Sequence, residues 1–164
     1  MSSQYSAQID QLHKTIYNPD ISEDEARQHV LRCCLDGLNI QQVGLWQYTD
    51  DDLLRCELLL DKNGGFSQEA LLLDRWSFPG YFAALDKRRV IKASDAMHDP
   101  ATKDLTELFL KPLNVKSLLD VPIYQGDKLT GIICCEQTVT IKRWTEDDVA
   151  FVLAVADIYR SRFS

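Results

Sequence analysis

The sequence predicts an α+β fold in which a central antiparallel sheet of about six strands has the N- and C-terminal helices on one face and short helices and loops on the other. Two observations predict the sheet. Long apolar segments at 117–124 and 128–138 flank a Gly126-Asp127 turn, and a second pair at 42–49 and 53–61 flanks three aspartates. A third observation predicts the helices, because apolar residues near both ends of the chain recur at helical spacing.

The composition is that of one acidic domain: 164 residues, 45% hydrophobic and 26% charged, are enough to bury a sizeable core. A net charge of −7 argues against non-specific nucleic-acid binding, which needs a basic face. No apolar segment reaches the length of a membrane span and the polar start is unlike a signal peptide, so we expect no membrane segment and a cytoplasmic location. The five cysteines include two adjacent pairs, which favours buried reduced thiols over disulfides.

We expect two parts in the chain. Residues 1–20 form an N-terminal helical segment, and residues 21–164 form the main domain. The first helix ends before Asn18-Pro19, since a residue before proline avoids the helical conformation. A capping box at Ser22 and Glu25 starts a second helix, and the last helix runs from 146 to about 163. Surplus apolar surface on the terminal helices predicts contact between them or with a second copy. For a parallel homodimer the expected contact residues are Tyr5, Ile9, Leu12, Ile16, Phe151, Val155 and Ile158.

Shorter elements are expected in the middle of the chain. Residues 66–77 are ambiguous, with a short strand around 70–73. A helix is predicted over 78–88 and a short strand over 90–93. Another helix is predicted from Asp99-Pro100 to about residue 110.

Strand alternation places carboxylates and aromatic residues on one face of the sheet. Asp120 and Glu136 share this face, and a carboxylate in a central strand needs a partner. Aromatic residues of the middle segment are expected to cover the face and form an apolar pocket with a few polar groups. The expected pocket residues are Trp46, Tyr48, Trp76, Tyr81, Phe82, Leu118, Asp120, Cys134 and Glu136. In the alternative interpretation the aromatic residues are core, and the carboxylates pair with Lys142, Arg143 or backbone amides.

Four segments, in this order, resemble the GAF domain, a small-molecule sensor module related to PAS domains. They are V-I-K-A-S-D-A-x-x-D-P from residue 90, V-x-S-x-L-x-V-P-I from 115, G-x-K-L-x-G-I-I from 126 and R-W-T-x-x-D from 143. The resemblance covers residues 22–163 and is greatest to GAF domains beside histidine kinase or cyclic-dinucleotide signalling domains. It implies a pocket between one sheet face and the middle helices. It also implies a role in two-component or cyclic-dinucleotide signalling with an output kinase or cyclase domain.

The branches of this family need different residues. Bilin attachment needs a cysteine beside a histidine, and none of His13, His29 and His98 neighbours one. The N-K…F-x-x-x-D-E signature of the cyclic-nucleotide branch is missing. His98 is the one candidate axial ligand for haem, but a histidine on a surface loop is the preferred interpretation. The sequence therefore identifies no cofactor and predicts no metal site.

The sequence predicts no enzyme, because G-x-S-x-G, Walker A and H-E-x-x-H motifs are all missing. The resemblance to GAF domains implies a sensory domain instead. Such a domain would bind an unidentified small molecule and relay the signal through the terminal helices of a dimer. Two alternatives stay open. One is a thiol-dependent enzyme of the free methionine sulfoxide reductase type, although Cys134 and Cys135 lie mid-strand, where a thiolate is hard to expose. The other is a ligand-free structural dimerisation module.

Overall fold

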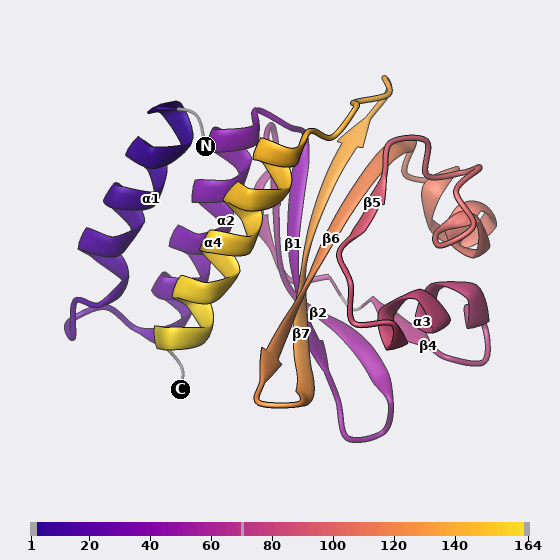
Figure 1. Ribbon diagram of the computed structural model, residues 1–164, viewed down its shortest axis with the longest axis horizontal. Helices are drawn as coiled ribbons and strands as arrows, with labels where there is room; N and C mark the ends of the chain where they lie inside the picture. Colours follow the sequence, from indigo (N-terminus) through magenta and orange to yellow (C-terminus); the bar gives the residue numbers. More distant parts are fainter. Residues whose placement is uncertain (1–2, 70, 163–164) are drawn as a thin grey trace.

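The computed structural model describes residues 3–69 and 71–162 and has three layers, seen edge-on in Figure 1. A seven-stranded antiparallel sheet lies in the middle. One face carries the helical layer, made of α1 (Ser3–Ile16), α2 (Glu23–Leu38) and α4 (Glu146–Arg162). Over the other face runs the middle segment, residues 75–110. The predicted α+β architecture, with terminal helices on one face, is confirmed.

The sheet has the order β3-β2-β1-β7-β6-β5, with β4 also pairing with β2. Both predicted hairpins are present, and Gly126 takes a φ of +61° in the turn between β6 and β7. A φ of this sign costs glycine little because it has no Cβ. The strands are β1 (Gln42–Tyr48), β2 (Leu53–Asp61), β3 (Gly65–Ser67), β4 (Leu72–Asp74), β5 (Ile91–Ala93), β6 (Val115–Gln125) and β7 (Lys128–Thr138). The expected strand near 70–73 corresponds to β4, while Ala70 lies outside the described residues.

The residues expected at a dimer contact pack inside the helical layer, five of them buried and two partly buried. Leu12, Ile16, Phe151, Val155 and Ile158 belong to one core with the facing side of the sheet, and Tyr5 and Ile9 pack against it. The Tyr5 and Phe151 rings stack with centroids 4.4 Å apart. Within the chain, α1 covers the apolar surface of α2 and α4, so these residues have internal partners, and the homodimer contact stays a prediction.

Capping interactions fix where the helices start. Ser22 and Glu25 form the predicted reciprocal capping box of α2. At α4, the Thr145 N–H donates to Asp148 Oδ2 at 2.9 Å, and the Asp148 N–H donates to Thr145 Oγ1 at 3.1 Å. The Tyr5 hydroxyl donates to the other Asp148 oxygen and so ties α1 to the start of α4. Across the described ranges, no helix is long and apolar enough to cross a bilayer.

The middle segment contains α3 (Pro79–Asp86), followed after β5 by a 3-10 turn, η1 (Lys103–Leu105), and a π-helical turn, η2 (Thr106–Leu110). The regular helix predicted from Asp99 to about residue 110 is thus replaced by irregular turns. Asp99 Oδ1 accepts from the Ala101 N–H at 2.9 Å, and the Thr102 hydroxyl donates to the Ala96 carbonyl at 2.6 Å. Such side-chain bonds satisfy the backbone locally and compete with a regular helix.

Candidate functional site

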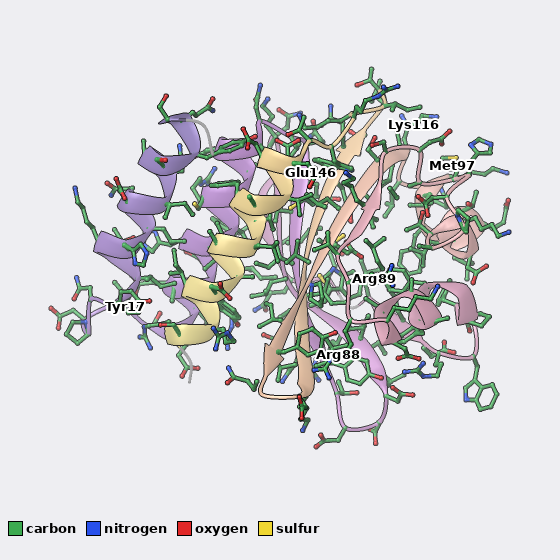
Figure 2. The ribbon with its side chains drawn as sticks, viewed as in Figure 1. Tyr17, Arg88, Arg89, Met97, Lys116 and Glu146 are labelled. Carbon is green, nitrogen blue, oxygen red and sulfur yellow. The ribbon has the colours of Figure 1, made fainter. Side chains whose placement is uncertain are left out.

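A cavity of about 260 Å³ lies between the sheet and the middle segment. Figure 2 shows Tyr17 at the outer edge of the helical layer and Met97 at the outer edge of the middle segment, with the sheet between them. The cavity is on the Met97 side. Its lining residues are Gln42, Trp46, Leu59, Glu69, Leu71, Leu73, Tyr81, Leu105, Phe109, Leu110, Leu113, Val115, Leu118, Asp120, Cys134 and Glu136. Glu69 and Leu113 are exposed, so the mouth lies near these two residues.

Strand register brings the polar groups of the cavity together. Asp120 lies opposite Cys134 across the β6–β7 pair, and Leu118 lies opposite Glu136. Trp46 of β1 is opposite Ile132 on the other side of β7. Because side chains two residues apart on a strand share a face, all of these groups point to the same side of the sheet. The predicted alternation is therefore present at the centre of the sheet.

The two carboxyls of the cavity are hydrogen-bonded to a phenol and a thiol, and not to a cation. The Tyr81 hydroxyl donates to Asp120 Oδ2, and the Cys134 thiol donates to Glu136 Oε1 at 3.3 Å. The structure does not contain the pairing with Lys142 or Arg143 that the alternative interpretation offered. Lys142 lies over the Trp144 ring at 5.8 Å, and Arg143 is exposed in the link between β7 and α4, so neither reaches this face.

Three buried polar atoms of the cavity have no hydrogen-bond partner within residues 3–69 and 71–162: Asp120 Oδ1, Glu136 Oε2 and Trp46 Nε1. The exposed fractions of the three residues are 1%, 9% and 8%. A buried donor or acceptor without a partner costs about 1–3 kcal/mol. Three such atoms in one cavity provide acceptors and a donor for a bound molecule.

Burial shifts the ionisation of these groups. It raises the pKa of Asp120 from 3.8 to about 6, against the opposing effect of the hydrogen bonds with Cys134 and Tyr81. Burial also raises the pKa of Glu136 from 4.5 to about 7, opposed by the Cys134 hydrogen bond and reinforced by the charge of Asp120. Burial raises the pKa of Tyr81 and of Cys134 well above their ordinary values, so both remain protonated donors at neutral pH.

The structure places six of the expected pocket residues around this cavity: Trp46, Tyr81, Leu118, Asp120, Cys134 and Glu136. Tyr48 and Phe82 lie elsewhere. The Tyr48 hydroxyl accepts from Arg75 at 3.1 Å, and Phe82 is fully buried beside the Tyr48 and Tyr81 rings. The prediction that Trp76 covers the face is wrong, because its side chain is 94% exposed in the turn after β4.

The sequence reasoning missed most of the apolar wall. Leu59 belongs to β2 and Leu73 to β4, and Leu71 immediately precedes β4. Leu105 and Phe109 come from η1 and η2. Their spacing of four was a usable signal for a shared face, even though the turn between them is not a regular helix.

The cysteines lack the exposure that nucleophilic chemistry needs. All five are free and buried, and burial raises the pKa of Cys56 to about 12. The Cys134 thiol is hydrogen-bonded to Glu136. Cys135 lies on the opposite face of the sheet, where it interacts with Cys34 of α2. In the part of the chain that the structure describes, no group of three His, Cys, Asp or Glu side chains is arranged to hold a metal ion.

The sequence profile of the GAF domain matches residues 24–159. The chain belongs to the GAF domain family. Comparison with curated protein sequences gives no match. The resemblance found in the four sequence segments is thus confirmed by a match over most of the chain.

Solved structures of GAF domains share this fold. A phycoerythrobilin-bound GAF domain from a cyanobacterial phytochrome has a TM-score of 0.81 at 15% identity, covering 99% of this chain and 96% of that one. The GAF domain of an Acinetobacter phosphoenolpyruvate-protein phosphotransferase has a TM-score of 0.77 at 12% identity, covering 99% and 94%. Residues 122 to 287 of a methyl-accepting chemotaxis protein have a TM-score of 0.73 at 17% identity, covering 95% and 94%. These neighbours belong to sensory or signalling proteins, and at such identities they show the fold alone.

Proposed function

We propose that this GAF domain is a non-catalytic sensory module that binds a small molecule in the cavity between the sheet and the middle segment. The observation that carries the proposal is the convergence of Asp120 Oδ1, Glu136 Oε2 and Trp46 Nε1, all buried and unpartnered, on an otherwise apolar cavity. Ligand pockets combine apolar walls with a few placed polar groups in this way. A bound molecule would supply the missing hydrogen bonds.

The size of the cavity favours a compact ligand. Its volume of about 260 Å³ lies just below the range of about 300–1,000 Å³ typical of pockets for drug-sized molecules. A linear tetrapyrrole such as the phycoerythrobilin of the phytochrome GAF domain is a large ligand for this space. A molecule of amino-acid size fits the volume better.

The strands give a route from the cavity to the helical layer. Asp120 faces the cavity, whereas its neighbours Leu119 and Val121 belong to the core beneath the helices. Cys134 and Cys135 are divided between the two faces in the same way. A ligand that moves β6 and β7 by a fraction of an ångström would therefore change the packing of α2 and α4, since packed cores have discrete arrangements.

The proposed relay ends in a cytoplasmic homodimer coupled to an output kinase or cyclase domain. The stripes first expected at the dimer contact are internal, so the contact would use the outer surface of the helical layer. Tyr17, just after α1, is an exposed apolar residue there, at 45%. Analytical ultracentrifugation with and without ligand tests this part: a monomer at micromolar concentration in both states would contradict it.

Native mass spectrometry of the protein purified from cells tests ligand binding. We expect a retained small molecule in the wild type. We expect its loss in Leu118→Phe, which places a larger side chain in the cavity. The matched control is Leu72→Phe on β4, because that side chain is 54% exposed and does not line the cavity. Equal retention in both variants, or no retained molecule in the wild type, would contradict the proposed site.

A further inference from the structure

The charges around the cavity are all of one sign. Among the described residues that line it, Glu69, Asp120 and Glu136 carry carboxyl groups, and none is Lys, Arg or His. A ligand with a phosphate or carboxylate would therefore meet like charges without a counterion. A positively charged group would meet buried carboxylates, which form the stronger class of hydrogen bond.

The hydrogen-bonding groups of the cavity carboxyls that have no partner also favour a positively charged ligand. Tyr81 and Cys134 already donate to one oxygen of each carboxyl, which leaves Asp120 Oδ1 and Glu136 Oε2 as acceptors. These residues lie on paired strands, and the position opposite Asp120 is two residues from Glu136. We propose that the ligand is a small organic amine whose protonated nitrogen donates to both Asp120 and Glu136. This inference rests on the proposed function of the cavity.

The rest of the cavity specifies the body of the amine. Its walls are apolar and come from β4, η1 and η2, with Leu73, Leu105, Phe109 and Leu110 contributing side chains. An alkyl or aromatic body would remove this surface from water. The unpartnered Trp46 N–H adds a place for one oxygen atom of the ligand, such as a hydroxyl or carbonyl.

Amine binding would depend on pH through the groups that face the nitrogen. These are Asp120 of β6, Cys134 and Glu136 of β7, and Tyr81 of α3; Cys56 of β2 lies close enough to sense Glu136, and Glu69 lies at the mouth. The two carboxyls lose their protons in the range from about 6 to about 7, whereas the raised pKa values keep the thiols and the phenol protonated. Affinity for the amine should therefore rise between about pH 5 and pH 8, a range in which an alkylamine stays charged.

Three matched probes test the inference: 2-phenylethylamine, 2-phenylethanol and 3-phenylpropanoate, which share an aromatic body and differ in the polar end. In calorimetric titration of the wild-type protein near neutral pH, we expect the amine to bind at least about 10-fold more tightly than the alcohol. The carboxylate should bind most weakly. Binding of the carboxylate as tight as that of the amine would overturn the inference.

Variants show whether the two carboxyls are responsible. Asp120→Asn and Glu136→Gln should each weaken amine binding by about 10- to 100-fold while changing alcohol binding by less than about 3-fold. Unchanged alcohol binding also shows that the cavity still forms. Glu107→Gln is the control, since this exposed side chain pairs with Lys111 on the surface and does not line the cavity. Equal losses for amine and alcohol would overturn the inference.

The mass-spectrometric experiment separates failure of the amine inference from failure of the proposed function. A retained amine that Leu118→Phe loses would support both. A retained acid or phosphate that this variant loses would overturn the amine class and leave the binding site standing. If none of the three probes binds and no molecule is retained, both proposals fail.

Discussion

Replacing Glu136 by glutamine should remove much of the pH dependence of folding stability. Glutamine is nearly isosteric with the protonated side chain and cannot ionise. Burial raises the pKa of Glu136 in the folded protein from 4.5 to about 7, so folding favours the protonated form. This contribution is fully present below about pH 4.5 and is lost as the pH rises through about 7. The difference between the two pKa values corresponds to a change of about 3 kcal/mol in the free energy of unfolding, at 1.36 kcal/mol per pKa unit.

The assay is urea unfolding followed by circular dichroism at about pH 4 and about pH 8.5, on either side of the titration. We expect the free energy of unfolding of Glu136→Gln, relative to that of the wild type, to be about 3 kcal/mol higher at the upper pH than at the lower. Asp120→Asn should change in the same direction, because burial raises the pKa of Asp120 to about 6. Glu107→Gln, at an exposed surface pair, should differ from the wild type by less than about 1 kcal/mol at either pH. A difference between Glu136→Gln and the wild type that is the same at both pH values would refute the reasoning.

Three further predictions concern the fold and the thiols. Gly131→Ala should lower the free energy of unfolding by about 1–3 kcal/mol, because the added Cβ would lie 2.6 Å from a main-chain carbonyl oxygen of β1. Gly64→Ala is the control, since the nearest atom to its added Cβ would lie at 3.6 Å. Asp148→Ala should cost about 1–3 kcal/mol in urea unfolding, since it removes the α4 cap and the acceptor of Tyr5, whereas an effect no larger than that of exposed Asp157→Ala would contradict this role. Native protein should react with a thiol reagent at neutral pH at least about 100-fold more slowly than urea-unfolded protein, because all five cysteines are buried; one rapidly reacting thiol would favour the redox alternative.

Alternation along the central strands could be predicted from the sequence, because period two determines which side chains share a face. It predicts that Asp120, Cys134 and Glu136 lie together, as the strand register shows. The partners of the carboxyls could not be predicted in this way. Tyr81 is 39 residues from Asp120 in the sequence, and its approach depends on how α3 lies over the sheet.

Three expectations differ from the structure, each for its own physical reason. An apolar stripe shows that one face of a helix is covered, but it does not show which element covers it. The sequence therefore cannot distinguish the contact of Tyr5 with Phe151 within one chain from a dimer contact. Local side-chain bonds also outweighed helix periodicity around Asp99 and Thr102. The expectation that Trp76 lines the pocket depends only on its being aromatic. Trp76 lies in the turn after β4, where no sequence periodicity indicates which way a side chain points.

The most direct test is an NMR titration of the tryptophan indole N–H signals with 2-phenylethylamine. Trp46 lines the cavity with an unpartnered N–H, Trp76 is 94% exposed, and Trp144 is buried on the helical side of the sheet, so the chain contains two internal controls. We expect a saturable shift of the Trp46 signal while those of Trp76 and Trp144 stay in place. A stationary Trp46 signal, or a shift confined to Trp76, would contradict binding of the amine in this cavity.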